Sequence, residues 1–149
     1  MARNTMFSLI FSAALILSGS SFAAEFGTAD EAKALLERAI TDVKADAAGA
    51  LVKFNSGEDG YRDRDLYVFC FSGADGVISA HPALVGTDVR GLKDNSGKAF
   101  GEEMFSNAQE GTISEIEYMF PRPGETDPVA KESYYTRIGG EICGVGYYK

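Results

Sequence analysis

The sequence predicts an α+β domain in which helices cover one antiparallel sheet. Residues 28–57 repeat apolar side chains every three or four positions, which is typical of an amphipathic helix. Residues 66–81 contain two β-rich runs joined by a glycine-bearing turn, and residues 112–148 contain three more. A helical segment separates the two groups of strands. Strands joined by short turns pair antiparallel, so one sheet covered by helices accounts for this order.

The first 23 residues have the features of a secretory signal peptide. Arg3 is the only charged residue before Glu25, residues 6–17 are almost all apolar, and small residues lead up to Ala23. The rival interpretation is a membrane anchor, but the apolar run is shorter than the roughly 18–20 residues that span a bilayer. We therefore expect residues 24–149 to form one periplasmic or secreted domain that is not inserted in the membrane after cleavage.

The charge balance argues against nucleic-acid partners. The chain has 14 Lys and Arg residues against 22 Asp and Glu residues, a formal net charge of −8, and it contains no basic run. Such a surface repels nucleic acid and anionic lipid at long range. Neither is expected as a partner.

One long helix is predicted to begin at Thr28, where Thr28-Ala29-Asp30-Glu31 has the form of a capping box. Glycines at positions 57 and 60 are expected to end it. The face predicted to pack on the sheet is formed by Ala32, Leu35, Leu36, Ala39, Ile40, Val43, Ala47, Leu51 and Phe54.

The first hairpin is predicted from residues 66–71 and 77–81, with Gly73-Ala74-Asp75-Gly76 as its turn. Pro82 cannot donate a ladder hydrogen bond, so the second strand should end near His81. Residues 83–97 read as a loop with one helical turn. Residues 98–109 have helical spacing that Gly111 ends.

The C-terminal meander is predicted from residues 112–120, 130–138 and 141–148, with a Pro/Gly-rich loop and a Gly-Gly turn between them. Side chains alternate between the faces of a strand. Lys131, Ser133 and Tyr135 should therefore share one face, with Glu132, Tyr134 and Thr136 on the other. Ile116, Tyr118 and Phe120 should likewise lie on one face.

Catalytic and metal-binding patterns are missing from the sequence. His81 is the only histidine, so neither HExxH nor a two-histidine metal site is present, and no GxSxG or phosphate-binding glycine loop occurs. Cys70 and Cys143 lie inside strand-like runs, which suits packing or a disulfide better than nucleophilic chemistry. We expect no enzyme activity, no metal and no cofactor. Hydrolysis or redox chemistry through a cysteine is the weakest hypothesis.

A small-molecule pocket is the stronger interpretation of the polar residues. His81 at a strand end and Lys131 inside a strand, together with hydroxyls and aromatic rings, suit a small carboxylate. Simpler alternatives remain. Lys131 could pair with a nearby Glu115 or Glu117, and His81 could bond a backbone carbonyl. Asp88 and Arg90 could pair with each other and merely fix the loop.

An ordered set of motifs resembles a known family. It comprises Gly76-Val77-Ile78-Ser79-Ala80-His81-Pro82, Gly86 with Asp88, Asp94-Asn95-Ser96-Gly97-Lys98-Ala99-Phe100, Gly111, Tyr118-Met119-Phe120-Pro121-Arg122-Pro123-Gly124, Lys131-Glu132-Ser133-Tyr134 and Cys143-Gly144-Val145-Gly146-Tyr147-Tyr148. Over nearly all of residues 24–149 the chain resembles the single Cache domain family, type 2. These are extracytoplasmic PAS-like sensor modules of bacterial chemoreceptors and histidine kinases.

The resemblance implies a five-stranded antiparallel sheet with the N-terminal helix behind it and a ligand pocket between the sheet and the helix-containing crossover. Its first and last strands would lie side by side, which implies a cross-strand disulfide between Cys70 and Cys143 if the register places both on one face. The implied ligands are small organic, carboxylate-like molecules. The implied ligand-binding residues are His81, Lys131 and Tyr118, followed by Arg90, Tyr134 and Tyr135.

Two further expectations concern the behaviour of the domain. An unperturbed imidazole titrates near pH ~6.5, so His81 is expected to make binding pH-dependent. The chain ends at Lys149, directly after the last predicted strand, whereas family sensors continue into a transmembrane helix and an output domain. We therefore expect a stand-alone binding domain with a membrane receptor or kinase as candidate partner. The alternative is an envelope accessory or interaction protein with a vestigial pocket.

Overall fold

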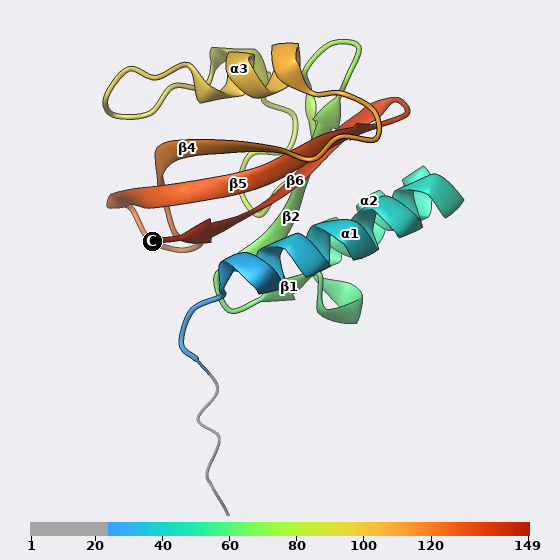
Figure 1. The fold of residues 1–149 in the computed structure, drawn as a ribbon, viewed down its shortest axis with the longest axis horizontal. Coiled ribbons are helices and arrows are strands. Elements are labelled where there is room, and N and C mark those ends of the chain that lie inside the picture. Colours follow the sequence, from blue (N-terminus) through green and yellow to red (C-terminus); the bar gives the residue numbers. More distant parts are fainter. Residues whose placement is uncertain (1–23) are drawn as a thin grey trace, which may run out of the picture.

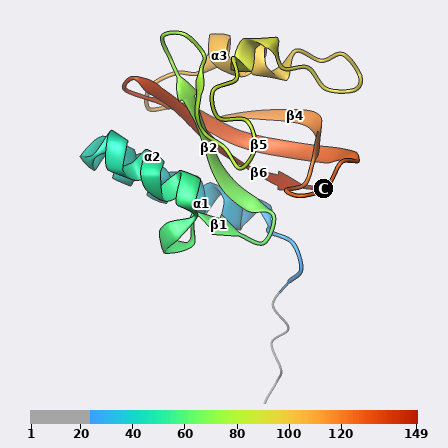
Figure 2. The ribbon, with the colours of Figure 1, turned by 180° about the vertical axis from the view of Figure 1, so that it is seen from behind.

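A computed structural model describes residues 24–149, and the predicted signal peptide lies outside the described residues. Figure 1 shows three layers: α1 (Ala29–Ala45) and α2 (Ala47–Ser56) on one face of a sheet, and α3 (Phe100–Asn107) with the crossover loops on the other. Figure 2 shows the same layers from behind. Within these residues, no helix is both long and apolar enough to cross a membrane.

The sheet of the described residues is antiparallel and confirms the predicted fold class. Its strands run in the order β1-β2-β6-β5-β4, and β3 pairs with β2. They are β1 (Arg62–Asp63), β2 (Leu66–Ser72), β3 (Ile78–Ala80), β4 (Ser114–Pro121), β5 (Pro128–Ile138) and β6 (Glu141–Tyr148). The five predicted strands are all found, and the two-residue β1 is an addition. Short 3₁₀ turns occur at Glu58–Gly60 and, in the predicted loop, at Val89–Gly91.

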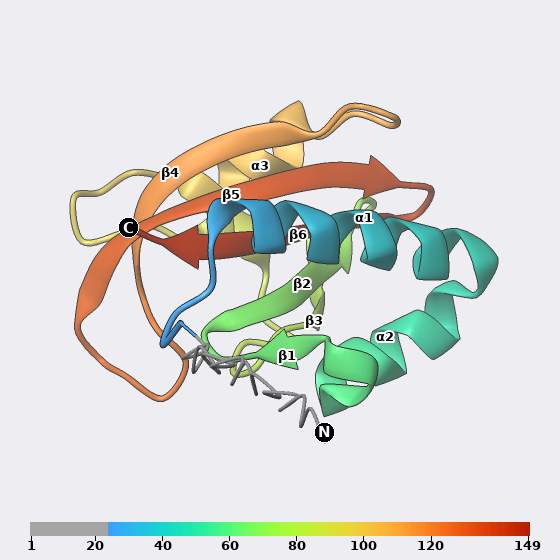
Figure 3. The same cartoon turned by 60° about the horizontal axis from the view of Figure 1, so that its bottom comes forward.

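The prediction of one long N-terminal helix is wrong, because the helix breaks at Asp46. This residue has an extended backbone (φ −156°), and its carboxylate accepts a hydrogen bond from Gly49 N at 3.1 Å, so it caps α2. Figure 3 shows α2 turning back along the sheet from the end of α1. The apolar stripe concealed the break, because its other positions are buried or partly buried in both helices, and only Ala47 beside the break is exposed. The predicted capping box at Thr28 is confirmed.

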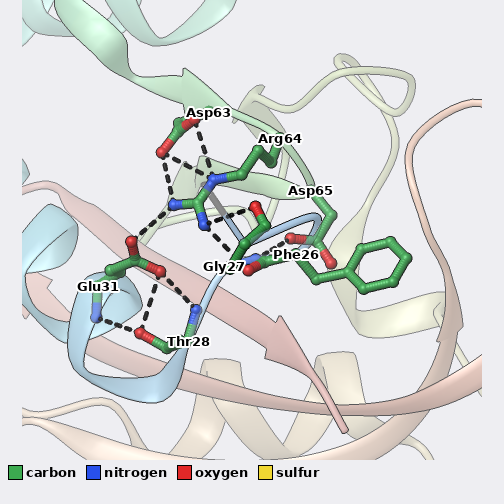
Figure 4. A network of polar contacts seen from close by, with 8 residues as sticks. Phe26, Gly27, Thr28, Glu31, Asp63, Arg64 and Asp65 are labelled. Carbon is green, nitrogen blue, oxygen red and sulfur yellow. Dashed lines mark hydrogen bonds and ion pairs between the residues drawn. The ribbon is translucent and has the colours of Figure 1, made fainter. Parts of the chain in front are cut away.

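The entry into α1 is tied to the turn between β1 and β2 (Figure 4). The Arg64 guanidinium donates to the carbonyl of Phe26 at 2.9 Å and to the carboxylate of Glu31 at 2.8 Å. The buried carboxylate of Asp65 accepts from Gly27 N at 2.7 Å. These contacts fix where the N-terminal segment approaches the sheet.

A disulfide joins the two central strands. Cys70 on β2 lies directly opposite Cys143 on β6, with a Cα–Cα distance of 4.1 Å, and both residues are fully buried. The structure thus has the cross-strand pairing that the family resemblance implied. The two sulfurs lie in the core on the α1 and α2 side of the sheet.

A second core lies between the sheet and the α3 side. The side chains that β2 turns toward this layer are Tyr67, Phe69 and Phe71, as alternation requires. They meet residues of the crossover, of α3 and of the other strands, namely Ile78, Val89, Phe100, Met104, Ala108, Ile116, Tyr118, Tyr135 and Ile142. This aromatic-rich layer is where the polar residues of interest converge.

Replacing both cysteines with alanine should lower the free energy of unfolding by about 4 kcal/mol, because the bridge closes a long loop across a sequence separation of 73 residues. Urea denaturation of the oxidised protein and of the Cys70→Ala/Cys143→Ala variant measures this difference. Reduced wild-type protein is the control that separates the lost crosslink from the lost sulfur packing. Two titratable thiols in unfolded, unreduced protein would contradict the assignment.

Candidate functional site

The most unusual residue of the aromatic layer is Lys131. It lies in the interior strand β5, and only 1% of its surface is exposed. Its ammonium is surrounded by aromatic rings instead of carboxylates, and rings near a cation attract it through their quadrupoles. The distances from Nζ to the ring centroids are 4.3 Å for Tyr67, 5.0 Å for Tyr148, 5.2 Å for Phe120, and 5.9 Å for both Phe69 and Tyr118.

The position of Lys131 follows from strand register and from a glycine. Lys131 pairs with Tyr118 on β4 and with Tyr148 on β6. Its side chain then crosses β6 toward β2 over Gly146. A Cβ at Gly146 would collide with Cε of Lys131 and with the hydroxyl of Ser133, so only glycine leaves this path open.

The ammonium has fewer partners than it can bind. Lys131 Nζ donates to Tyr67 Oη at 2.7 Å, and no carboxylate among residues 24–149 forms an ion pair with it. An ammonium carries three N–H donors, so two have no protein acceptor in the described part of the chain. Burial lowers the pKa of Lys131 to about 7, against a smaller opposing effect of the Asp65 charge.

His81 is held as a neutral imidazole of one tautomer. Its Nδ1 accepts hydrogen bonds from Ala83 N at 3.0 Å and Leu84 N at 3.2 Å, so the ring proton is on Nε2. Nε2 faces Tyr67 Oη at 3.4 Å. Burial, together with the charges of Lys131 and Arg62, lowers the pKa of His81 to about 3. The expectation that His81 titrates near neutral pH is therefore wrong.

The backbone of His81 is fixed by α2. The side-chain oxygen of Asn55 accepts from His81 N at 3.3 Å, while its amide donates to Ser79 O at 2.8 Å. The imidazole packs edge-on against Tyr67 and Phe120, with ring centroids 5.1 and 6.0 Å away. The strand therefore ends with its imidazole directed at the aromatic layer.

Tyr67 connects the two groups. A hydroxyl oxygen has two acceptor positions, and Lys131 and the Nε2–H of His81 occupy them. The hydroxyl hydrogen of Tyr67 is directed to the neighbouring hydroxyl of Tyr148. Burial raises the pKa of Tyr67 well above its usual value, so the phenol stays neutral and is no counter-ion for the lysine. The cluster has surplus donors and no anion.

Two hollows meet at this cluster. The inner cavity measures about 20 Å³, enough for one water molecule, and its deeper lining is apolar. The outer groove measures about 230 Å³ and lies between the loop that follows His81 and the hairpin at Pro121–Glu125. Tyr67, His81, Leu84 and Phe120 line both hollows. Tyr67 and His81 therefore lie where a solvent-open groove meets an apolar interior, whereas Lys131 lines neither hollow and is connected to them through its hydrogen bond to Tyr67.

The structure brings together the three residues ranked first from the sequence. Tyr118 lies beside Lys131, bonds Ser133 at 3.0 Å through its hydroxyl, and stacks on Phe100 at a centroid distance of 4.2 Å. His81 and Lys131 meet through Tyr67. Neither simpler alternative for these two residues holds: the lysine is not paired with a glutamate, and the imidazole accepts backbone N–H groups. Whether these residues bind a ligand stays a prediction.

The three second-ranked residues lie elsewhere. Arg90 is exposed and bonds Asp88 at 2.7 Å, as the simpler alternative proposed. Tyr134 is on the opposite face of the sheet, where it stacks on Tyr147. Tyr135 is buried on the correct face but lines neither hollow.

Sequence reasoning missed Tyr67, Phe120 and Gly146 as parts of the site. Tyr67 lies in the apolar run of β2, and its hydroxyl is the only sign in the sequence that this face of the strand has a polar function. That sign is weak. Phe120 was assigned to the correct face but given no role. The importance of Gly146 depends on register across three strands, which the sequence does not show.

Replacing Lys131 with methionine should stabilise the protein at low pH, because it removes a buried charge that lacks a counter-ion. The lysine pKa is about 7 in the folded protein against its usual value of 10.5, so the unfolded state binds more protons between these values. The wild type thus gains stability as pH rises through this range. Urea denaturation should show a gain for Lys131→Met on the order of 2–4 kcal/mol at about pH 6, shrinking toward about pH 10. A pH-independent difference would contradict this.

Because His81 is the only histidine, its state can be read directly by ¹⁵N NMR. The spectrum should show one neutral tautomer, protonated at Nε2, throughout roughly pH 5 to 8, since the folded-state pKa is about 3. The same protein unfolded in urea is the control and should titrate near pH ~6.5. A midpoint near that value in the folded protein would disprove the assignment.

Comparison with known proteins agrees with this geometry. The family model of Single Cache domain 2 matches residues 22–146. Among curated proteins, the methyl-accepting chemotaxis protein McpP of Pseudomonas putida is 35% identical over 71 residues, which is 46% of this chain and 13% of that protein. The chain thus corresponds to a small part of that relative.

Two solved structures have the same fold. A methyl-accepting chemotaxis protein from Vibrio parahaemolyticus superposes with a TM-score of 0.64 at 20% identity, covering 80% of this chain and 86% of that one. A structure described as "Structural basis for carboxylic acid recognition by a Cache chemosensory domain" has a TM-score of 0.59 at 24% identity, covering 78% and 84%. With the family match spanning almost all of residues 24–149, this chain belongs to the Single Cache domain 2 family.

Proposed function

We propose that this domain binds a small carboxylate at the junction of the two hollows and acts as a sensor by binding, without catalysis. The observation that carries the proposal is the buried ammonium of Lys131, which has no carboxylate partner and lies beside the hydroxyl of Tyr67. A carboxylate supplies the missing negative charge and accepts charge-assisted hydrogen bonds from the ammonium and from the Tyr67 hydroxyl, which turns to it from Tyr148. Its short apolar part would enter the inner cavity, whose deeper lining is apolar.

The relatives support a sensory role. McpP and the Vibrio protein are methyl-accepting chemotaxis proteins by name, and the second structural neighbour is described as recognising a carboxylic acid. In this proposal the domain is extracytoplasmic, with residues 1–23 as its signal peptide. The disulfide suits such an oxidising compartment. The domain would present its ligand state to a membrane receptor or kinase.

The size of the inner cavity favours one competing function. A volume of about 20 Å³ holds a water molecule, so even acetate requires side chains at the junction to move. Leu84 is only half-buried there and borders both hollows, so it is the side chain best placed to give way. If the Leu84 side chain does not move aside, the pocket is vestigial and the domain is an envelope interaction protein.

Acetate, propionate and butyrate, tested by thermal shift and calorimetry at about pH 6, should bind and raise the melting temperature, whereas the alcohols of equal length should not. Tyr67→Phe removes only the hydroxyl and should weaken acid binding by about tenfold or more, the value of one hydrogen bond to a charged group. The melting temperature of the unliganded variant measures folding separately.

The matched control is Tyr147→Phe, the same change on the other face of the sheet, where the hydroxyl bonds Glu132 at 3.0 Å. Its affinity for the acids should equal that of the wild type. Failure of every acid to bind, or equal affinities of the Tyr67→Phe and Tyr147→Phe variants, would reject the proposed site. The first outcome supports the vestigial pocket.

A further inference from the structure

We propose that ligand binding at this site is coupled to the uptake of one proton by Lys131, so that the domain takes up a carboxylate anion and a proton together. The inference rests on the proposed function and specifies how pH regulates it. The proton comes from the solvent and adds to the lone pair of a neutral amine. The products are a buried ammonium and the carboxylate that neutralises it.

The geometry provides no other charge to balance the ammonium. The side chains that face Lys131 from β2, β4 and β6 are neutral aromatics, and Ser133 lies beside it on β5. From the loop after β3, His81 approaches through Tyr67 as a neutral ring. A positive charge enclosed in this way is costly without a partner, and an arriving anion removes that cost.

The charged residues near the site are already committed to one another. The carboxylate of Asp65, in the β1–β2 turn, accepts from Gly27 N at 2.7 Å, as Figure 4 shows, and from Arg122 Nε at 3.4 Å. Lys149 at the end of β6 bonds Glu132 at 2.7 Å and also Glu117. None of these acids forms an ion pair with Lys131 among the described residues, so the ligand is its counter-ion.

Tyr67 makes the coupling specific. When Lys131 is neutral, its lone pair can accept the hydroxyl hydrogen of Tyr67. When Lys131 is protonated, it can only donate, so the hydrogen bond between them reverses and the hydroxyl hydrogen turns away from Lys131, toward Tyr148 in the unliganded domain and toward the ligand when one is bound. Protonation therefore supplies the positive charge and one extra donor in the same step.

The titration properties of the cluster agree with this assignment. The pKa of Lys131 is about 7, within the range where a change of pH alters its charge. The pKa of His81 is about 3, and the pKa values of Tyr67 and Tyr118 are raised by burial, so none of these three changes charge near neutral pH. Affinity should thus be constant below about pH 7 and fall above it, by about tenfold between pH ~6 and pH ~8.

The first test needs no ligand. The ¹³Cε resonances of the lysines are followed by NMR from about pH 5 to 11, with Lys131 assigned by its absence from Lys131→Met. Lys131 should titrate at about pH 7, about three pH units below the usual value for a lysine side chain. Titration of Lys131 at that usual value would overturn the proposal.

The second test measures proton uptake directly. Propionate is titrated calorimetrically into the whole exported domain in HEPES and in Tris, which differ in ionisation enthalpy. At about pH 8 the difference in binding enthalpy between the two buffers should correspond to about one proton taken up per propionate bound. At about pH 6 it should correspond to almost none. Lys44→Met is the control and should keep the wild-type uptake.

The outcomes separate the two proposals. Binding at both pH values with the same enthalpy in both buffers overturns the proton coupling and leaves the proposed function intact. Absence of binding at about pH 6, where the lysine is charged, overturns the proposed function and the coupling with it.

Discussion

The buried, unpaired ammonium of Lys131 is the constraint around which the α3 side of this domain is organised. Five aromatic rings lie within 6 Å of it, and a cation–π contact contributes about 0.5–2 kcal/mol. Burial nevertheless lowers the pKa of the lysine from 10.5 to about 7. That decrease corresponds to a penalty of about 5 kcal/mol on the charged form. The rings keep water away from the charge without supplying a counter-ion.

This penalty gives the site its physical meaning. A structural lysine in a core would be paired, and the cheapest way to stabilise the fold would be an apolar residue of similar volume. Here the chain instead maintains a special path for the side chain over Gly146, and holds Tyr67 and His81 as hydrogen-bonding neighbours. Local destabilisation of this kind is typical of binding sites, where stability is lower because the partner supplies part of the interactions. In the proposed function, the bound anion would regain the free energy that burial of the charge costs.

Much of the fold could be predicted because it depends on local patterns. The capping box at Thr28, the hairpin turn and the alternation along β5 each act within a few residues, and the structure confirms them. The break at Asp46 was hidden because an N-cap inside an apolar stripe leaves the stripe intact. The site was predicted only in part. Lys131 and His81 stood out as polar residues in strands, but the role of Tyr67 and the neutrality of His81 depend on contacts between residues far apart in sequence.

Asp65 shows why neighbouring charges are as important as the lysine itself. Its carboxylate is buried, and its charge acts on Lys131, so it is the obvious internal counter-ion. It is instead held by Gly27 N and Arg122, and the guanidinium of Arg122 also covers the ring of Phe26 at 4.3 Å. The N-terminal segment and the groove hairpin thus keep this acid engaged, while Arg122 and Lys131 both contact the ring of Tyr148. Because that acid is unavailable, the ammonium stays unpaired, and an external anion can compete for it without first displacing an ion pair.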